Sequence, residues 1–548
     1  MRVAALLLLL AGCAKETPPP EPAAAAPFGV SFSDVTRETG ITFVHDGGAS
    51  PRKWLPETMG SGVLMLDFDG DGKIDLLFPS RGATRLFRNE GGWKFTDATG
   101  AAGIDAKGYA MGGAVADYDA DGDPDVYLTC LDGNLLLRND GGRFARVPGA
   151  PSGGGWGDAT GEFASWSTGA AWLDADGDGD LDLVVVNYVR WAPHRDVYAE
   201  VVEGEKAYTR PQLYEGDRPR LYLQESGGTF RDATKGSGLD ETAVAGKSLG
   251  LSVDDFDGDG RSDLFVANDT VQNFLFLATG PARWREAAAA SGVAYDDAGA
   301  ARAAMGVDSA DWRNDGGVAI AVGNFSDEPL SLFAREGDRF RDEAAAAGLL
   351  EPTRVPLTFG VLFRDLDLDG RADLAVANGH IEPSIGKLRR ELLHAQAPQV
   401  FRNLGGGRFR DLSAEAGLVE PIVGRGLAAG DLDGDGDLDL VLTANGGPPL
   451  VLRNDLANGN RCLRLRLRQP GTRNVDAIGA KVVVRAGGIA RRDVVRTGGS
   501  YLSGSEPVLT FGLGGATEAV VDVTWPDGTR QEGIRLAAGP RTRVVERR

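Results

Sequence analysis

Cysteine, histidine and long apolar runs are all scarce in this chain of 548 residues. Only three cysteines occur, Cys13, Cys130 and Cys462, so a framework of disulfides is excluded as the basis of the fold. Cys130 and Cys462 lie in apolar, strand-like runs and are either two buried thiols or one bridge. The four histidines are never at metal-ligand spacing. After the first residues, no run is long and apolar enough to predict a transmembrane helix.

Positive charge is also in short supply. The chain has 58 lysines and arginines against 79 acidic residues, and its net charge is -21. Such an acidic surface repels nucleic acid and anionic lipid, and it attracts cations. We therefore expect no nucleic-acid partner. The hydrophobic share of 42% is ample for a core, and the 78 glycines suit tight turns between short strands.

The first 13 residues, MRVAALLLLLAGC, join one basic residue to a short apolar segment and end in Leu-Ala-Gly-Cys. The segment is too short to span a bilayer. It resembles the lipobox of bacterial lipoproteins, which implies a signal peptide over 1–13 and a lipid on Cys13. An ordinary signal peptide with a chance cysteine is the alternative. Residues 14–27 are rich in Pro and Ala and predict an extended tether. We expect a lipid-anchored, extracytoplasmic protein that is either periplasmic or surface-exposed. Lys15 rather than an acid follows Ala14, which by analogy with the sorting of bacterial lipoproteins implies the outer membrane.

A nine-residue motif with aspartates at positions 1, 3, 5 and 9 recurs along the chain. Calcium takes six to eight oxygen ligands, and these carboxylates converge if the backbone curls. Glycine at position 4 or 6 permits the curl. A degenerate copy, DWRNDGGVA, lies at 311–319, where Arg313 replaces the second aspartate and Ala319 the last. The six intact copies are DFDGDGKID at 67–75, DYDADGDPD at 117–125, DADGDGDLD at 174–182, DFDGDGRSD at 255–263, DLDLDGRAD at 365–373 and DLDGDGDLD at 431–439.

This spacing predicts about six structural Ca²⁺ ions. Positions 1, 3, 5 and 9 would supply carboxylates and position 7 its backbone carbonyl. Without a cation the four carboxylates would repel one another. Six Ca²⁺ ions would add twelve positive charges and reduce the net charge from -21 to about -9. The predicted ligands are Asp67, Asp69, Asp71, Lys73 and Asp75; Asp117, Asp119, Asp121, Asp123 and Asp125; Asp174, Asp176, Asp178, Asp180 and Asp182; Asp255, Asp257, Asp259, Arg261 and Asp263; Asp365, Asp367, Asp369, Arg371 and Asp373; and Asp431, Asp433, Asp435, Asp437 and Asp439.

The motif is not an EF-hand. That loop needs a bidentate glutamate at position 12 and a helix after it. Strand-like sequence follows each copy instead, and position 12 is apolar: Phe78, Leu128, Val185, Val266, Val376 and Leu442.

A second element, an aromatic-x-acid segment followed by Gly and an aliphatic residue, alternates with the loops. Examples are FSDVTRETGI from Phe32 and FRDLSAEAGL from Phe409, and a weak copy begins at Phe144. There are seven loops and seven such segments, but the series opens with a segment and closes with a loop. In a ring, the N-terminal strand would complete the last blade and remove an exposed edge. We therefore predict seven blades over 28–455, with insertions at 189–220 and 380–398.

These repeats resemble the FG-GAP/VCBS repeats of integrin α-subunit propellers and of many bacterial surface proteins. Residues 456–548 resemble the ASPIC/UnbV module that follows such repeats in the cartilage acidic protein family. This second resemblance rests on NRCLRLRL at 460–467, NVDAIGAKVVV at 474–484 and FGLGGATEAVVDVTWPDG at 511–528. Together they imply an all-β protein, a seven-bladed integrin-α-like β-propeller followed by a small β-domain.

The expected function is binding or adhesion at the cell surface. A propeller face offers loops on a rigid scaffold, which suits a protein or glycan ligand. The membrane would be reached only through the N-terminal lipid. No catalytic residue is assigned, because GKSLG at 246–250 fits a hydrolase elbow in letters but precedes a loop rather than a helix. The alternatives are a glycan- or phosphoester-directed hydrolase and a periplasmic assembly or accessory factor.

Overall fold

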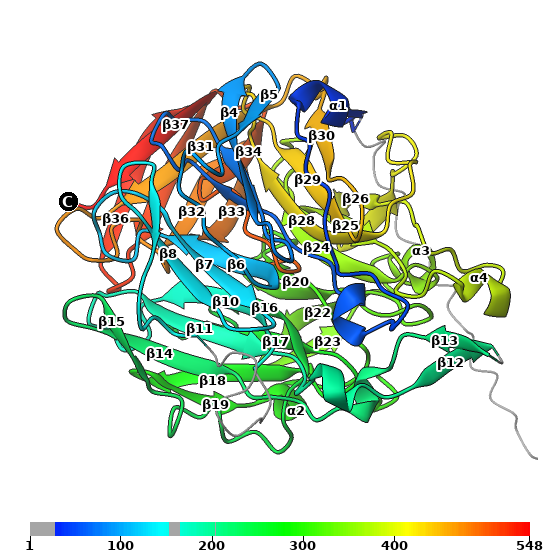
Figure 1. The fold of residues 1–548 in the computed structure, drawn as a ribbon. Coiled ribbons are helices and arrows are strands. Elements are labelled where there is room, and N and C mark those ends of the chain that lie inside the picture. Colours follow the sequence, from blue (N-terminus) through cyan, green and yellow to red (C-terminus); the bar gives the residue numbers. More distant parts are fainter. Residues whose placement is uncertain (1–27, 153–164, 203) are drawn as a thin grey trace, which may run out of the picture.

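The computed structural model describes residues 28–152, 165–202 and 204–548, and it consists almost wholly of β-strands (Figure 1). The predicted signal peptide, Cys13 and the tether lie outside the described residues. No described helix is long and apolar enough to cross a membrane. The all-β fold class is confirmed. The helices are short: α1 (Thr36–Thr39), α2 (Ala288–Ser291), α3 (Leu350–Arg354) and α4 (Ile385–Leu388), with 3-10 turns η1 (Leu55–Thr58), η2 (Pro193–Arg195) and η3 (Pro211–Leu213).

Antiparallel four-stranded sheets form the larger part of the described chain, and the strands of each sheet lie side by side in the following order. They are β2 (Leu64–Leu66), β3 (Asp75–Phe78), β4 (Arg85–Gly91) and β5 (Lys94–Asp97); β6 (Ala110–Ala116), β7 (Asp125–Cys130), β8 (Leu135–Asn139) and β9 (Phe144–Arg146); β10 (Ser167–Leu173), β11 (Asp182–Asn187), β14 (Arg220–Glu225) and β15 (Thr229–Asp232); β16 (Ser248–Asp254), β17 (Asp263–Asn268), β18 (Phe274–Gly280) and β19 (Arg283–Glu286); β20 (Val307–Ala310), β21 (Ala319–Val322), β22 (Ser331–Glu336) and β23 (Arg339–Asp342); β24 (Thr358–Arg364), β25 (Asp373–Asn378), β26 (Gln399–Gly405) and β27 (Arg408–Asp411); and β28 (Gly424–Gly430), β29 (Asp439–Ala444), β30 (Leu450–Asn454) and β1 (Phe32–Asp34).

These sheets form a closed ring. Their first strands contact one another in the order β2, β6, β10, β16, β20, β24 and β28, and β28 in turn contacts β2. The N-terminal strand β1 pairs antiparallel with β30, with Phe32 opposite Asn454, so the first described strand completes the last sheet. This is the closure predicted from the offset between loops and aromatic segments, and it removes an exposed edge.

The C-terminal domain consists of two further sheets that lie on one face of the ring (Figure 1). The cores of the ring and of the C-terminal domain are continuous, because Tyr118 and Trp172 of the ring share one buried cluster with Val482, Phe511 and Trp525. One sheet has the order β34 (Leu509–Gly514), β31 (Arg461–Arg468) and β37 (Gly539–Glu546); the other has the order β33 (Ile489–Val494), β32 (Lys481–Ala486), β35 (Glu518–Thr524) and β36 (Arg530–Ala537).

Residues 496–506, within the connection between β33 and β34, enter the centre of the ring, and we call them the axial segment. Tyr501 is fully buried and its hydroxyl donates to the carbonyl of Met59 at 3.1 Å. Leu502 passes so close to Gly62 that a Cβ there would lie 1.7 Å from the Leu502 carbonyl oxygen. The glycine is therefore required by close approach of two backbones. Contacts of the axial segment at the centre of the ring thus join the C-terminal domain to the ring.

The two insertions meet on the other face of the ring. They join the second and third strands of their sheets, so they lie at the opposite end from the loops that join the first and second. The hairpin of β12 (Ala199–Val202) and β13 (Glu205–Ala207) contacts α4. Lys387 of α4 pairs with Glu205 of β13 at 2.6 Å. The insertions thus connect the third and sixth sheets across this face.

Candidate metal-binding loops

Each intact copy of the acidic motif joins the first strand of its sheet to the second. In the first copy, Gly70 and Gly72 take left-handed conformations, with φ of 71° and 85°. The ninth aspartate of this loop fixes the turn. Asp75 accepts hydrogen bonds from the backbone amides of Phe68 at 3.0 Å and Asn89 at 2.7 Å. The carboxylate thereby joins the loop to the third strand of the sheet.

The same pair of amide bonds recurs at the ninth aspartate of every intact loop. Sequence reasoning assigned this residue only to the metal and missed the second role. The donors are always the loop's second residue and one residue of the third strand: Tyr118 and Asn139 to Asp125, Ala175 and Gln224 to Asp182, Phe256 and Ala278 to Asp263, Leu366 and Asn403 to Asp373, and Leu432 and Asn454 to Asp439.

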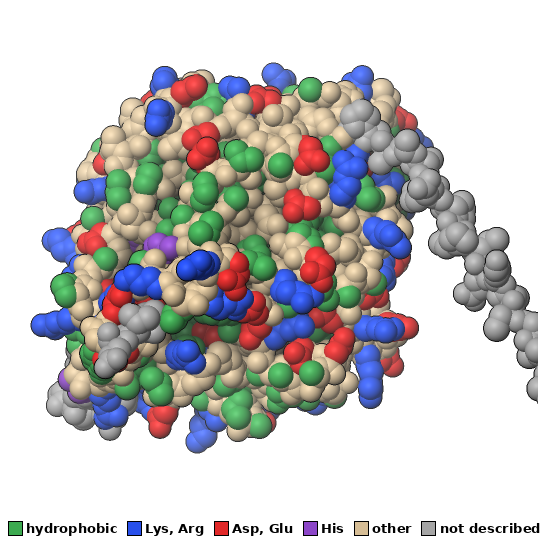
Figure 2. Space-filling view, turned by 90° about the vertical axis from the view of Figure 1, so that its right-hand side faces the viewer, with side chains coloured by type: hydrophobic (Ala, Val, Ile, Leu, Met, Phe, Trp, Pro, Cys, Tyr) green, Lys and Arg blue, Asp and Glu red, His purple; other side chains and the backbone are tan. Residues whose placement is uncertain are grey.

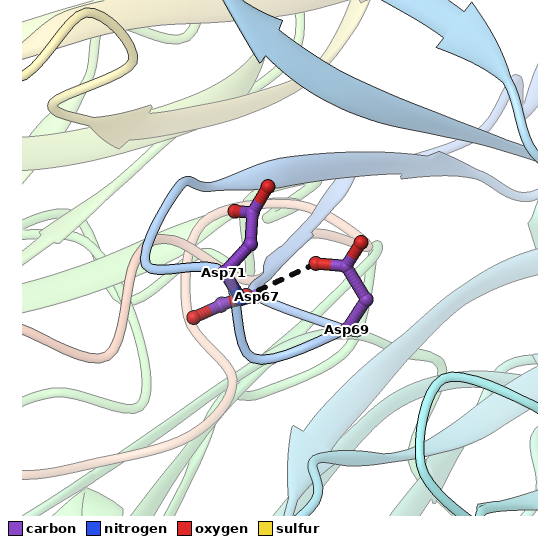
Figure 3. A group of neighbouring side chains, drawn as sticks. All are labelled: Asp67, Asp69 and Asp71. Atoms are coloured by element: carbon purple, nitrogen blue, oxygen red, sulfur yellow. Dashed lines mark hydrogen bonds between the residues drawn. The ribbon is translucent and has the colours of Figure 1, made fainter.

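Acidic side chains converge within the loops. In each convergent group, one oxygen from each of three aspartates lies within 4.8 Å of the others. Figure 3 shows Asp67, Asp69 and Asp71 arranged around one point. Groups of the same kind are Asp117, Asp119 and Asp125; Asp174, Asp176 and Asp182; Asp255, Asp257 and Asp259; and Asp365, Asp367 and Asp373.

Several of these carboxylates carry a buried oxygen with no hydrogen-bond partner among the described residues. A buried polar atom without a partner is costly, and a cation would satisfy it. The donor set consists of oxygens alone, which fits the hard cation Ca²⁺. The atoms are Oδ1 of Asp67, Asp117, Asp119, Asp365 and Asp437.

Burial and like charge oppose ionisation of the loops in the absence of a cation. Burial raises the pKa of Asp75 to about 8, and the neighbouring charges of Asp69 and Asp67 add to the effect. Burial likewise raises the pKa of Asp125 to about 9 and that of Asp437 to about 8. A metal-free loop would therefore hold protons near neutral pH, and a bound cation would release them.

The basic side chains at position 7 turn back onto the fifth aspartate of their loops. Lys73 pairs with Asp71 at 2.6 Å, and Arg371 pairs with Asp369 at 2.8 Å. Arg261 and Asp259 form the same ion pair. This placement explains why a basic side chain is tolerated at position 7. The predicted role of its carbonyl as a ligand stays a prediction.

The degenerate loop keeps the turn but redirects its charges. Asp311 accepts the amides of Asp315 and Gly316 at 3.0 and 2.9 Å. Arg313, at the place of the second aspartate, pairs with Glu343 and lies over the ring of Trp312 at 4.8 Å. A guanidinium thus stands where the intact loops have a carboxylate.

A second polar cluster, the axial-face cluster, lies where the insertions meet and consists of Lys53, Glu57, Tyr208 and Glu382. Lys53 pairs with Glu382 at 2.9 Å. The backbone amide of Tyr208 donates to Glu382 at 3.2 Å, and its hydroxyl donates to Glu57 at 3.3 Å. These residues come from three separate segments of the chain, so no local spacing could have revealed the cluster. The insertion lengths were the only signal.

Arg425 lies beneath this region and is fully buried. It donates to the carbonyls of Thr58 at 2.8 Å, Gly379 at 3.0 Å and Gly424 at 2.7 Å, and it lies 4.0 Å over the ring of Phe359. Burial lowers its pKa to about 10. The guanidinium joins the last sheet to the segments that carry the cluster.

Two further expectations are settled by the structure. Ser248 of the GKSLG segment is buried at the start of β16 and its Oγ donates to Asn268 at 2.8 Å, so the segment is no strand-to-helix elbow. Cys130 and Cys462 are both free and buried, which leaves two thiols rather than a bridge.

Comparison with known proteins finds two family models that match parts of the chain. The FG-GAP-like repeat model matches residues 67–128, 255–322 and 385–442. The ASPIC and UnbV model matches residues 471–548. A lectin of Agrocybe aegerita that recognises non-reducing terminal N-acetylglucosamine matches with 17% identity and a TM-score of 0.37, over 64% of this chain and 79% of that chain.

Two curated relatives are both named cartilage acidic protein 1. The human protein is 29% identical over 69% of this chain and 52% of its own length. The mouse protein is 30% identical over 65% of this chain and 51% of its own length. The chain thus spans about half the length of the curated relatives it matches. It carries FG-GAP-like repeats and an ASPIC and UnbV domain, and it is homologous to cartilage acidic protein 1.

Proposed function

We propose that this chain is a calcium-stabilised β-propeller that acts as a binding or adhesion module outside the cytoplasm, anchored through a lipid on Cys13. One observation carries the calcium assignment. Aspartates converge in the acidic loops, and several of their buried oxygens have no partner among the described residues. Calcium would fix the connection between the first two strands of each blade and neutralise the carboxylates.

The ligand is proposed to bind the face formed by the insertions. The loops at this end carry most of the large apolar side chains that are exposed, among them Leu388 at 54% and Leu393 at 59%. Figure 2 views the side of the molecule on which α4, β12 and β13 lie in Figure 1, and apolar, basic and acidic side chains are interspersed there. A mixed surface on a rigid scaffold suits recognition of a protein or a glycan.

Thermal unfolding tests the calcium part of the proposal. The melting temperature should fall sharply when EDTA removes calcium and return when calcium is restored, with magnesium a poor substitute. An identical melt with and without the chelator would refute a structural role for calcium.

Proximity labelling of the lipoprotein in its own cells tests the binding part. A double variant, Leu388→Asp with Leu393→Asp, should lose the labelled partner. Val544→Asp is the matched control, because Val544 is 56% exposed but lies in the C-terminal domain. Equal labelling in the two variants would place the ligand elsewhere.

The axial-face cluster supports a second candidate, a glycan-directed hydrolase. Glu57 and Glu382 both bond to Tyr208, and paired carboxylates are the groups that glycoside hydrolysis requires. Activity on a polysaccharide panel that disappears in both Glu57→Gln and Glu382→Gln would favour this function. Absence of activity across the panel would favour the binding module over the hydrolase.

A further inference from the structure

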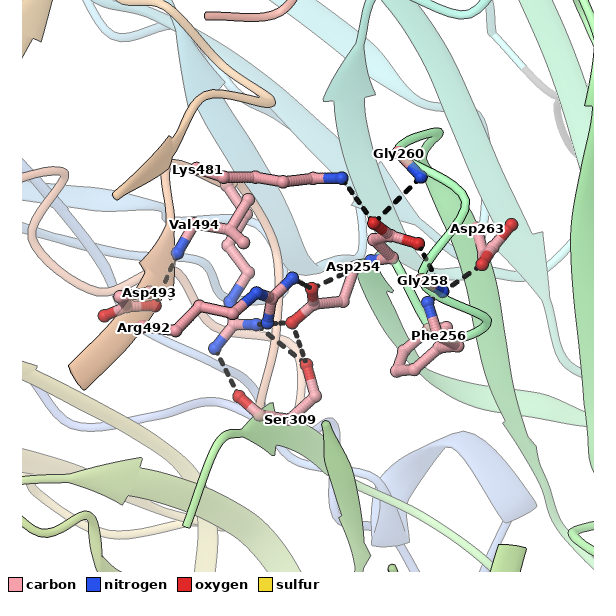
Figure 4. Close-up of polar contacts among 12 residues, drawn as sticks. Asp254, Phe256, Gly258, Gly260, Asp263, Ser309, Lys481, Arg492, Asp493 and Val494 are labelled. Atoms are coloured by element: carbon pink, nitrogen blue, oxygen red, sulfur yellow. Dashed lines mark hydrogen bonds and ion pairs between the residues drawn. The ribbon is translucent and has the colours of Figure 1, made fainter. Parts of the chain in front are cut away.

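The C-terminal domain covers the face of the ring that carries the acidic loops. In Figure 4, Lys481 of β32 reaches the loop at 255–263, and it pairs with Asp255 at 2.5 Å. Arg464 of β31 pairs with Asp431 at 2.8 Å. Arg473 pairs with Asp180 at 3.2 Å. The domain therefore contacts predicted calcium ligands in three different loops.

The loop at 365–373 is covered most completely. The amide of Gly512 donates to Oδ2 of Asp365 at 3.0 Å, and the amide of Gly514 donates to the carbonyl of Leu368 at 2.9 Å. From β33, the Nε of Arg491 donates to the carbonyl of Gly370 at 3.1 Å. We call Arg491 and residues 512–514 the lid.

Burial sets this loop apart from the other five intact copies. Asp367 is 0% exposed, whereas the other third-position aspartates are half-buried or exposed; Arg402 of β26 pairs with its carboxylate at 2.8 Å and accounts for part of this burial. Asp369 is half-buried, whereas the other fifth-position aspartates are exposed. A Cβ on Gly370 would lie 1.8 Å from Arg491, but one on Gly72 at the same position of the first loop would meet nothing within 4 Å.

The sequence of the loop fits this contact. Its fourth residue is Leu368, where the other intact loops have glycine or alanine. Leu368 takes a left-handed φ of 55°, a conformation that is unfavourable for leucine. Leu368 is 3% exposed and its carbonyl accepts the amide of Gly514, so contact with the lid holds the strained backbone in place.

We propose that the lid traps the calcium ion of the loop at 365–373, so that this ion leaves only when β34 and Arg491 lift off the ring. The inference rests on the proposed function, since it requires that the loops bind calcium. The ion in an open loop exchanges as soon as its ligands release it. The covered ion must wait for local opening of the domain interface, which adds a free-energy barrier to its release.

Calcium release into a fluorescent chelator tests the proposal by stopped flow. The calcium-loaded chain should release most ions quickly and about one ion per chain at least about ten-fold more slowly. Gly512→Ala should convert the slow phase into a fast one without changing the total, because the new Cβ would lie 2.1 Å from Oδ2 of Asp365 and 2.5 Å from Cα of Leu368. Gly515→Ala is the control, since a Cβ there meets nothing within 4 Å.

A second pair of variants covers the case in which Gly512→Ala does not fold. Arg491→Ala removes the donor to Gly370, and Arg485→Ala removes an arginine of β32 that pairs with Asp522 instead. Arg491→Ala should lose the slow phase and Arg485→Ala should keep it. A single fast phase in the unaltered chain, or a slow phase that survives in Gly512→Ala and Arg491→Ala, would overturn the lid alone. A chain that binds no calcium would overturn the proposed function as well.

Discussion

Arg464 of the C-terminal domain and Asp431 of the last acidic loop form a buried ion pair at 2.8 Å. The same guanidinium also pairs with Glu506 of the axial segment. The side chain of Arg464 is 8% exposed, that of Asp431 is 0% exposed and that of Glu506 is 4% exposed. One arginine therefore neutralises a predicted calcium ligand and a glutamate of the axial segment, and it couples the C-terminal domain to the metal loop.

Arg464→Met should destabilise the chain most when calcium is absent. Removing one partner of a buried ion pair costs about 3–5 kcal/mol, because the remaining charges are left uncompensated. Calcium in the loop at 431–439 would compensate the charge of Asp431. Only the charge of Glu506 would then be left without its partner. Denaturant unfolding with EDTA and with calcium measures both losses. Equal losses in the two conditions would contradict the coupling.

The metal-free chain should become less stable as the pH rises from about 4 to about 8. Burial raises the folded-state pKa of Asp75 to about 8 from an ordinary 3.8, so folding favours the protonated group. The stabilisation is complete below the unfolded pKa and is lost as the pH rises through the folded one. Saturating calcium should abolish this trend, because the ion replaces the proton. Melting temperatures measured in EDTA across this pH range provide the test. A rise in stability toward pH 8 would contradict the prediction.

Asp75→Ala should destabilise the fold even without calcium. Its carboxylate accepts two buried amides, and each amide left without a partner costs about 1–3 kcal/mol. Asp71→Ala is the matched comparison in the same loop. Asp71 lies at the surface, where its ion pairs with Lys73 and Arg88 contribute little to the free energy of unfolding. Its loss should therefore weaken the stabilisation by calcium and leave the metal-free melt nearly unchanged. If the two variants behave alike in EDTA, the ninth aspartate has no separate structural role.

Arg425→Ala should cost about 3 kcal/mol or more, at the upper end of the range for point substitutions, because it breaks a buried hydrogen-bond network. The carbonyls of Thr58, Gly379 and Gly424 would each lose a donor, and a cavity would open beside Phe359. Arg425→Lys should restore little, because an ammonium group does not reproduce the planar fork. Urea unfolding distinguishes these outcomes, and a loss of less than about 1 kcal/mol in Arg425→Ala would contradict this role of the guanidinium.

The local part of this architecture could be predicted from sequence, because it repeats. The nine-residue spacing located the acidic loops, and the unmatched aromatic segment at Phe32 predicted the strand that pairs with β30. Both signals are short-range patterns whose copies support one another.

The long-range part could not be predicted, because no spacing encodes it. The contact of Gly512 with Asp365 joins residues 147 positions apart, and that of Tyr501 with Met59 joins residues 442 apart. Leu368 replaces the usual glycine at the fourth loop position, but Ala120 does so as well, so this position alone did not indicate the lid. The leucine at this position is explained only by the contact of the C-terminal domain with the loop.

Counting calcium ions by equilibrium dialysis of the purified chain tests the central claim most directly. We expect about six Ca²⁺ per chain, one for each intact loop, and a loss of one when Asp67 and Asp69 are both replaced by alanine. Binding of no more than one ion, or a count that this double substitution does not change, would contradict the calcium assignment.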